Sequence, residues 1–304
     1  MRILVLGFTG YLGGHVAEHL RALPGVRVLG GGRSPAAEFG IDLATARTDE
    51  LARALAEAEP DAVINCAGAT GGDSVTLAEV NSRGPAALCA ALRKAAPSAR
   101  LVHLGSVAEY GLGTPHTKVT ESAATHPLSV YGATKLAGTV TVTTSGLDAV
   151  VLRVGNPVGA GAPATGLPGR IAGLLREAGP DPAAVIRLGD LSAYRDFVDA
   201  RDVARAAALA VSAPRPLPGV LNIGAGQAVP VRELVQALAR IARYRGRIDE
   251  NGDGRSVRSG EVSWQCSDIT AAEDALGWRP SYTLDDSLTA LWEATARREG
   301  VRAP

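Results

Sequence analysis

Residues 2–20, "RILVLGFTGYLGGHVAEHL", constrain the fold of this chain more than any other stretch. They combine a short apolar strand, a turn containing Gly7, Gly10 and Gly13, and a segment with helical spacing of apolar residues. Glycines let a backbone approach a pyrophosphate, and a helix N-terminus supplies N–H groups and positive potential. A glycine-rich strand–helix turn can also be purely structural, but its position as the first βα turn favours a dinucleotide site. The predicted cofactor contacts in this turn are Gly7, Thr9, Gly10, Tyr11, Leu12 and Gly13.

Apolar strands and helices continue to alternate along the first half of the chain. After the first strand, we expect strands within residues 24–31, 61–68, 99–106 and 147–156, separated by helices. Such alternation predicts an α/β fold, namely a Rossmann-type doubly wound parallel sheet with helices on both faces. We expect the helix within residues 75–97 to break near Gly84 and Pro85.

The composition of the sequence changes after Asn156, where a Gly- and Pro-rich loop begins. Mixed helices and short strands follow, which predicts a smaller, interleaved C-terminal substrate-binding region. We place the dinucleotide-binding domain at residues 1–155, with 190–216 returning to it. Residues 156–189 and 217–304 are then assigned to the substrate-binding region.

Composition excludes several classes of partner. The chain of 304 residues has 31 basic and 31 acidic side chains, so its net charge favours neither nucleic acid nor an anionic membrane surface. Its three cysteines are far apart and form no metal-binding pattern. No stretch approaches the roughly 18 apolar residues of a membrane helix, and the N-terminal apolar run is too short for a signal peptide. We therefore expect a cytoplasmic protein without a metal.

The end of the second strand bears on the choice of cofactor. NAD sites usually carry an acidic residue there for the ribose hydroxyls, whereas this strand ends "VLGGGRS". Arg33 and Ser34 stand where a 2′-phosphate would lie, and an arginine fork suits a phosphate. This pattern favours NADP(H), with NAD as the alternative if Arg33 is an ordinary surface arginine.

Further cofactor contacts are expected along the same edge of the sheet. Asp42, next to Leu43, could accept from the adenine amino group or cap the following helix. Ala67 and Gly68 end a strand, and their small size leaves room for the adenosine ribose. For Asn81 we favour a structural hydrogen bond within its helix over a functional role.

"SVYGATK", residues 129–135, holds the candidate catalytic pair. Lys135 follows Tyr131 by four positions, so both side chains can lie on one helical face. A nearby cation stabilises a tyrosinate and so makes tyrosine a better acid–base group near neutral pH. Lys135 is one of only three lysines in the chain, among 31 basic residues. Ser106 ends another strand, where its hydroxyl can bond a substrate carbonyl, although it could instead cap a helix.

With these residues in place, the sequence resembles the extended short-chain dehydrogenases/reductases, the NAD(P)-dependent epimerase/dehydratase family. The resemblance spans nearly the whole chain. It rests on "GFTGYLG", "GSVAEYG", "YGATK", "LRVGN", "YRDFVDARDVA", "LNIGAG" and "DALGWRPSYTLDDSL". It implies that Ser106, Tyr131 and Lys135 form the catalytic triad and that nicotinamide carries the hydride. It also implies that Tyr131 and Lys135 contact the cofactor, with Lys135 holding the nicotinamide ribose. Members commonly form homodimers, so a homodimer is a candidate assembly.

The same resemblance bears on the reaction. Sugar dehydratases of this family carry an Asp-Glu pair after the catalytic residue, whereas Val107 and Ala108 stand here, and Glu109 is one position too far. Because Arg33 favours exchangeable NADPH, we expect a ketoreductase acting on a nucleotide-linked keto-deoxysugar. The alternatives are an epimerase that retains NAD, a reductase of a free ketone such as a polyketide aglycone, and a non-catalytic dinucleotide sensor.

Three residues match the family's nucleotide-sugar contacts. The resemblance implies that Asn156 in "LRVGN", Arg195 in "YRDFVD" and Arg258 in "RSGE" contact a sugar diphosphate. "GNPVGAG" departs from the family's aromatic-containing pattern and puts the pocket shape in doubt. An ion pair of Arg195 with Asp196 or Asp199, and a solvated surface position for Arg258, are the structural alternatives. For Asp199, Asp202 and Trp278 we expect structural roles, with Asp199 capping a helix.

Overall fold

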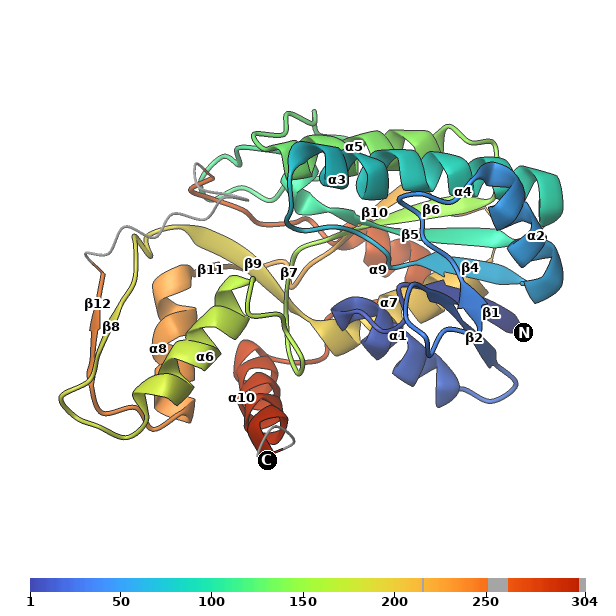
Figure 1. Ribbon diagram of the computed structural model, residues 1–304. Coiled ribbons are helices and arrows are strands. Elements are labelled where there is room, and N and C mark those ends of the chain that lie inside the picture. Colours follow the sequence, from blue (N-terminus) through green and yellow to red (C-terminus); the bar gives the residue numbers. More distant parts are fainter. Residues whose placement is uncertain (215, 251–261, 301–304) are drawn as a thin grey trace.

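The computed structural model describes residues 1–214, 216–250 and 262–300, with side chains to residue 296, and its centre is a seven-stranded parallel sheet (Figure 1). The strand order is β10-β6-β5-β4-β1-β2-β3. The strands are β1 (Arg2–Leu6), β2 (Arg27–Gly32), β3 (Phe39–Gly40), β4 (Ala62–Asn65), β5 (Arg100–Ser106), β6 (Ala149–Val154) and β10 (Val220–Ile223).

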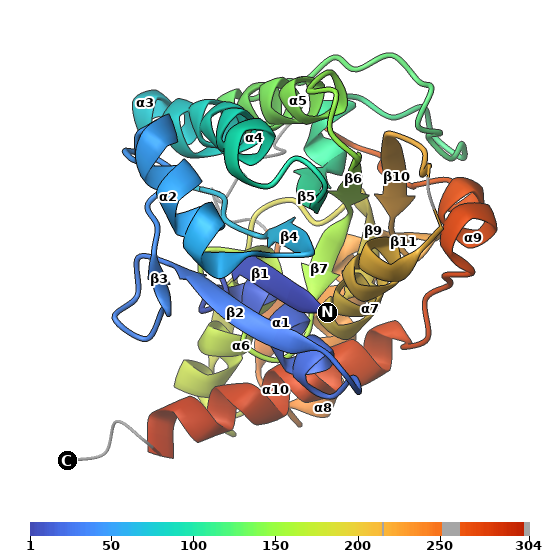
Figure 2. The same cartoon turned by 90° about the vertical axis from the view of Figure 1, so that its right-hand side faces the viewer.

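Helices cover both faces of this sheet, as expected for strands that are apolar on both sides (Figure 2). On one face lie α2, α4 and α5, and on the other α1 and α7. Their bounds are Tyr11–Arg21 for α1, Thr48–Ala58 for α2, Gly84–Ala95 for α4, Val130–Thr143 for α5 and Ala200–Ser212 for α7. The predicted Rossmann-type doubly wound fold is therefore confirmed.

The predicted break near Gly84 and Pro85 is an irregular turn rather than an interruption. Helix α3 (Ser74–Ala78) runs through a π-helical turn, Glu79–Arg83, directly into α4. Pro85 lies in the first turn of α4, where a missing N–H group costs nothing. The irregularity thus lies one turn before the glycine.

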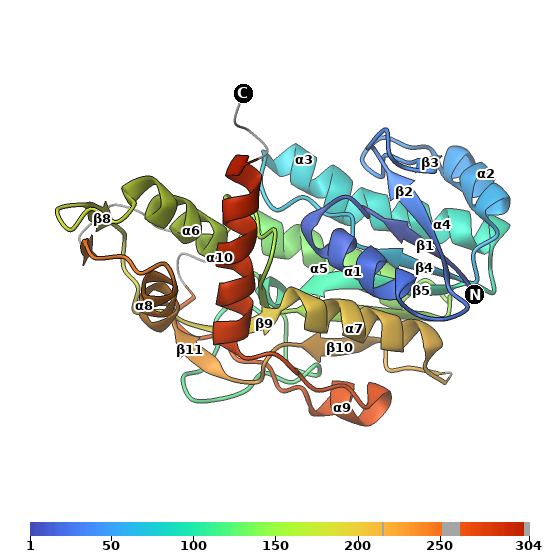
Figure 3. The same cartoon turned by 90° about the horizontal axis from the view of Figure 1, so that it is seen from below.

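Smaller elements gather at the carboxyl ends of the central strands. One sheet has the order β11-β9-β7, and β8 pairs with β12 in another. Helix α10 packs against α6 and α8 beside these sheets (Figure 3). The bounds are Asn156–Val158 for β7, Leu167–Ala178 for α6, Val185–Arg187 for β8, Tyr194–Asp199 for β9, Ala228–Pro230 for β11, Val231–Ile241 for α8, Arg247–Asp249 for β12, Thr270–Leu276 for α9 and Leu284–Gly300 for α10.

Two segments pair in other sheets than the predicted domain boundaries imply. Residues 220–223, assigned to the substrate-binding region, form β10 and pair in parallel with β6 in the large sheet. Within residues 190–216, only α7 returns to the large sheet, because β9 pairs with β7 and β11 instead. The apolar strand β10 joins the large sheet because β6 offers it an edge for pairing, and Leu221 and Ile223 pack in one core cluster with residues of α7 and α9.

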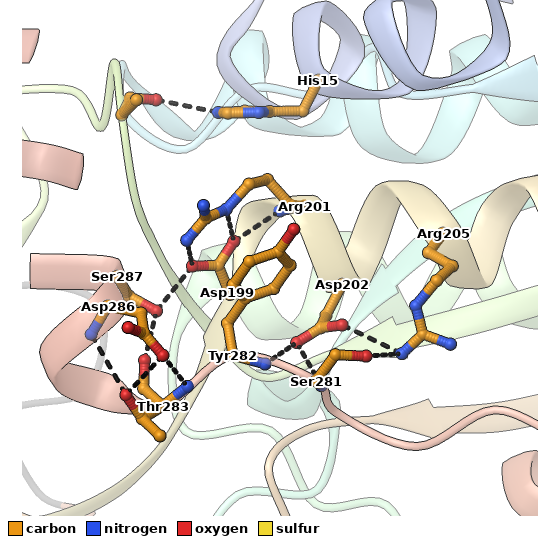
Figure 4. Close-up of polar contacts among 11 residues, drawn as sticks. His15, Asp199, Arg201, Asp202, Arg205, Ser281, Tyr282, Thr283, Asp286 and Ser287 are labelled. Atoms are coloured by element: carbon orange, nitrogen blue, oxygen red, sulfur yellow. Dashed lines mark hydrogen bonds and ion pairs between the residues drawn. The ribbon is translucent and has the colours of Figure 1, made fainter. Parts of the chain in front are cut away.

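The start of α7 anchors the C-terminal segment, which confirms the structural role expected for Asp199 (Figure 4). Its carboxylate accepts the backbone N–H of Arg201 and so caps α7. The same carboxylate pairs with the Arg201 side chain at 2.7 Å and accepts the hydroxyl of Ser287 from α10. Asp199 therefore ties the last helix of the chain to the large sheet.

Asp202 and Trp278 complete this anchor, and both have the structural roles that we expected. The Asp202 carboxylate accepts the backbone N–H groups of Ser281 and Tyr282 (Figure 4). Trp278 is fully buried, and its indole donates to the Asp202 carbonyl. None of the described helices is long and apolar enough to cross a membrane.

Candidate active site

The glycine-rich turn has the geometry that a pyrophosphate site needs. Gly7 follows β1 with φ of +73°, its N–H donates to the Gly31 carbonyl, and its own carbonyl accepts from Gly10. No side chain caps α1, so the N–H groups at the start of this helix remain available to an anionic ligand. A Cβ at Gly13 would lie 2.1 Å from the Gly7 carbonyl oxygen, so this position requires glycine.

Gly13→Ala tests this turn. We expect it to lower NADPH affinity by at least about tenfold, because a 2.1 Å contact with backbone forces the turn to move. Calorimetric titration with NADPH measures the effect. Gly173→Ala is the matched control: Gly173 lies in α6 with nothing within 4 Å of its added methyl group, so binding stays unchanged. Wild-type affinity in Gly13→Ala would contradict the assignment.

Arg33 and Ser34 follow the end of β2, beside the glycine turn. A Cβ on the preceding Gly32 would lie 3.8 Å from the Gly7 nitrogen, which places the two segments together. Arg33 is exposed and has no hydrogen bond or ion pair with the described part of the chain, whereas the Ser34 hydroxyl accepts the N–H of Ala36. The guanidinium is therefore available to a ligand at this edge.

Asp42 does not cap the following helix, which corrects one of its two expected roles. Helix α2 begins only at Thr48, and the Asp42 carboxylate accepts from Ala44 in a turn before it. Leu43 is buried in the core beneath α2 and α4, so its side chain faces the protein interior. The adenine contact of Asp42 stays a prediction.

Ala67 and Gly68 connect the glycine turn with the catalytic helix. A Cβ at Gly7 would lie 2.9 Å from the Ala67 nitrogen, and one at Gly68 would lie 3.9 Å from Lys135 Nζ. Asn81 donates to the Ala69 carbonyl and accepts its N–H, so it holds this segment. Its hydrogen bonds therefore leave the π-helical turn rather than stay within it, and the role is structural as expected.

Ser106 and the candidate catalytic helix meet at the end of β5. The Ser106 hydroxyl oxygen accepts the N–H of Ala108 at 3.2 Å, so it caps the short 3₁₀ turn Val107–Glu109. Its own proton is then available to bond a substrate oxygen. A Cβ at Gly132 would lie 2.5 Å from the Ala108 carbonyl oxygen. The glycine next to Tyr131 thus lets α5 approach the end of β5 closely, a requirement that the sequence motif alone does not reveal.

Lys135 occupies a buried position one helical turn after Tyr131. Its side chain is 5% exposed, and Nζ donates to the Leu104 carbonyl at 2.6 Å. Burial lowers the pKa of this lysine to about 8, and the Glu109 carboxylate acts against that shift. The ammonium is thus a titratable group near neutral pH. It lies between β5 and the predicted cofactor segment, Ala67 and Gly68.

Glu109, considered as a weak substitute for a dehydratase acid, is fully buried and has two fixed partners. One carboxylate oxygen accepts the backbone N–H of Ser106 at 2.7 Å, and the other accepts from Arg153 at 2.7 Å. A carboxylate held in this way faces the interior and cannot act on a substrate. The structure therefore provides no dehydratase pair after Ser106.

Two of the three predicted substrate residues lie on neighbouring strands of the small sheet. β7 starts at Asn156 and runs parallel to β9, which carries Arg195. The Asn156 amide donates both to the Asp196 carbonyl and to the side chain of Gln265, a neighbour that sequence spacing did not indicate. Arg258 lies outside the described residues.

Arg195 is 7% exposed, and burial lowers its pKa to about 10. Its guanidinium donates to the Tyr194 carbonyl at 2.8 Å. The Asp196 carboxylate accepts backbone N–H groups, and that of Asp199 pairs with Arg201, so both carboxylates considered as partners of Arg195 have other roles. A buried cation at this place suits an anionic ligand.

Comparisons with known proteins agree with this geometry. The model of the NAD dependent epimerase/dehydratase family matches residues 3–224. The chain is 37% identical to dTDP-6-deoxy-L-talose 4-dehydrogenase (NAD(P)(+)) of Kitasatospora kifunensis, over 96% of this chain and 95% of the relative. It is 28% identical to GDP-6-deoxy-D-mannose reductase of Pseudomonas aeruginosa, over 98% and 99%.

A solved structure shows the same fold. RMD from Pseudomonas aeruginosa in complex with NADPH superposes with a TM-score of 0.84 at 28% identity, over 98% of this chain and 99% of that one. Across the described residues, no group of three or more His, Cys, Asp or Glu side chains could hold a metal ion. The chain therefore belongs to the NAD-dependent epimerase/dehydratase family and is an NAD(P)-dependent oxidoreductase of the extended short-chain dehydrogenase/reductase type.

Proposed function

We propose that this protein is an NADPH-dependent ketoreductase that reduces a carbonyl of a nucleotide-linked keto-deoxysugar. The observation that carries the proposal is the contact between Gly132 and Ala108, which brings the start of α5 to Ser106 beside the cofactor segment. Two relatives that align with nearly the full length of this chain support the proposal. Both are named as oxidoreductases of nucleotide-linked 6-deoxyhexoses. We infer that the substrate is a sugar of this class.

Each catalytic residue has one task in this reaction. When bound, NADPH supplies the hydride to the carbonyl carbon. Tyr131 donates its phenolic proton to the carbonyl oxygen, and the Ser106 hydroxyl donates a hydrogen bond to the same oxygen. The Lys135 ammonium stabilises the tyrosinate that remains. The ketone and one proton thus become an alcohol, and NADPH becomes NADP⁺.

The diphosphate of the substrate is assigned to the small sheet. Arg195 supplies a buried positive charge there. Both N–H groups of the Asn156 amide have protein acceptors, which leaves its carbonyl oxygen for the ligand. We therefore propose that Asn156 accepts from a sugar hydroxyl rather than donates to the diphosphate. This revises the role that the family resemblance implied.

The choice of NADPH rests on Arg33. We expect Arg33→Ser to raise the KM for NADPH by about 10- to 100-fold, the value of one or two charge-assisted hydrogen bonds to a phosphate. The KM for NADH stays unchanged, because NADH lacks the 2′-phosphate. Arg53→Ser, an exposed arginine on α2, is the matched control. Equal effects on both cofactors would contradict the assignment of Arg33.

One set of assays separates this proposal from its alternatives. Consumption of NADPH with a nucleoside-diphosphate keto-deoxysugar is the expected result. Stoichiometric NAD in the purified protein, with no net consumption, would indicate an epimerase. Turnover of a free ketone without binding of a nucleoside diphosphate would indicate an aglycone reductase, and cofactor binding without turnover of any ketone would indicate a sensor.

A further inference from the structure

Glu109 lies directly beneath the candidate catalytic centre without facing the substrate. Its side chain is fully buried, and its two carboxylate oxygens have different partners. Oε1 accepts the backbone N–H of Ser106, and Oε2 accepts from Arg153 Nε, both at 2.7 Å. A buried carboxylate requires such partners, since an unpaired one would cost several kcal/mol. Through Oε1, the carboxylate fixes the backbone of the residue that carries the catalytic hydroxyl.

The residue before Ser106 makes room for this carboxylate. A Cβ at Gly105 would lie 2.8 Å from Glu109 Oε1 and 2.7 Å from Val151 Cγ1. Any other residue at position 105 would therefore displace the carboxylate or the strand. The missing side chain at Gly105 thus leaves the space that the Glu109 carboxylate occupies at the end of β5.

Arg153 is itself held firmly in place. It lies on β6, and its guanidinium stacks over the Tyr110 ring at 4.6 Å from the ring centroid. The Tyr110 hydroxyl donates to Asn222, which is fully buried on β10. Arg153, the cation that pairs with Glu109, is thus held in place by contacts from β6 and β10. The carboxylate cannot rotate away without leaving Arg153 unpaired.

The second charge near Glu109 is the Lys135 ammonium. The groups that act on this lysine come from three directions: Glu109 from the 3₁₀ turn, Cys66 from the segment after β4, and His103 from β5, with Tyr131 on the same helix. Burial lowers the pKa of His103 and raises that of Cys66, so both are neutral near pH 7. The ammonium donates to the Leu104 carbonyl, and a Cβ at the next residue, Gly105, would lie 2.8 Å from Glu109 Oε1, so the ammonium and the carboxylate lie beside adjacent residues of β5. Glu109 is therefore the negative charge that this ammonium meets before the reaction.

We propose that Glu109 is a positioning residue for the reduction: its carboxylate fixes the backbone of Ser106 and supplies the negative charge that stabilises the Lys135 ammonium. This inference rests on the proposed function. It explains why Glu109 stands three residues after Ser106 although no dehydratase pair is present. The residue acts through Ser106 and Lys135 and touches neither substrate nor cofactor.

Glu109→Gln is the variant that separates charge from shape. Glutamine keeps an oxygen for the Ser106 N–H but carries no charge, so the Lys135 ammonium loses its stabilising partner. The lysine should then release its proton at a pH about one unit lower than in the wild type. The alkaline limb of the kcat profile for ketone reduction should move to lower pH by the same amount, because a neutral lysine no longer stabilises the tyrosinate.

The lysine titration can be read directly, without turnover. The chain has only three lysines, so protein labelled with ¹³C at lysine Cε gives three signals, which Lys94→Arg and Lys118→Arg assign. We expect the Lys135 signal to move to lower pH in Glu109→Gln. Glu121→Gln is the matched control: Glu121 likewise accepts one backbone N–H, that of Asn222, and its change leaves Lys135 unaffected.

A second variant guards against misfolding. Glu109→Gln leaves Arg153 buried and unpaired, which destabilises a fold, whereas Glu109→Gln with Arg153→Met removes both charges and is far less costly. We expect this double variant to recover thermal stability but to keep the shifted Lys135 titration. A purely structural role predicts the opposite: stability and an unshifted titration return together.

The outcomes distinguish the two proposals. A wild-type protein that turns over no ketosugar would overturn the proposed function, while the lysine titration would still decide the electrostatic role of Glu109. Ketosugar turnover together with an unshifted Lys135 signal in the folded single or double variant would overturn the role of Glu109 and leave the proposed function standing.

Discussion

Tyr131→Phe is expected to lower kcat for ketosugar reduction by about 10²- to 10⁴-fold, the usual contribution of a positioned general acid. The phenyl ring fills the same space on α5 but has no proton to give to the carbonyl oxygen. The fold and the glycine turn are untouched, so NADPH affinity should fall by no more than about tenfold, the value of one hydrogen bond. Stopped-flow measurement of NADPH oxidation, with calorimetry for cofactor binding, separates the two effects.

Tyr282→Phe is the matched control for this prediction. Its ring stacks on Arg201 at 3.6 Å, far along the chain from the catalytic helix, and the phenylalanine ring can keep that stacking. The control should therefore retain wild-type kcat. If Tyr131→Phe kept full NADPH-dependent turnover on the true substrate, the proton donor would have to be another group.

Asp196→Ala is expected to lower the free energy of unfolding by about 3 kcal/mol or more. The carboxylate is fully buried and accepts backbone N–H groups of Ala225, Gly226 and Ser267. Each buried donor that loses its acceptor costs about 1–3 kcal/mol. At roughly 2 °C per kcal/mol for a chain of this size, the melting temperature should fall by at least about 6 °C.

The same substitution should also weaken substrate binding, because the Asp196 carboxylate ties β9, the strand that carries Arg195, to the backbone of Ala225 and Ser267. Thermal unfolding followed by circular dichroism measures the first effect, and the KM for the ketosugar measures the second. Asp181→Ala is the control, since this exposed carboxylate accepts only the N–H of Ala183 in a turn. It should change stability by about 1 kcal/mol or less, and equal losses in both variants would refute the role of Asp196.

The local features of the site could be predicted because they lie within one or two turns of chain. The three glycines stand between a strand and a helix, and Tyr131 and Lys135 are four residues apart, so the periodicity of a helix places them together. The helix cap formed by Asp199 follows from one residue type at a helix start. In each case, a hydrogen bond or contact within a few residues decides the structure.

The sequence was least informative where distant segments compete for the same edge or partner. Residues 220–223 have an apolar strand pattern that fits either sheet, and the free edge of β6 decided for the large one. Asn156 matches a diphosphate contact by motif, but Gln265, 109 residues later, takes one of its N–H groups. Neither partner could be found from spacing alone.

By itself, the sequence determined the Rossmann-type fold, the glycine turn and the Tyr131–Lys135 pair, because short-range periodicity and backbone sterics fix them. Only the tertiary structure decided the charges around that pair. Glu109 meets Arg153 across 44 residues, and Asp196 holds Ser267 across 71. Such pairs leave no periodic signal, since a buried charge takes whichever partner the completed sheet brings within hydrogen-bonding distance.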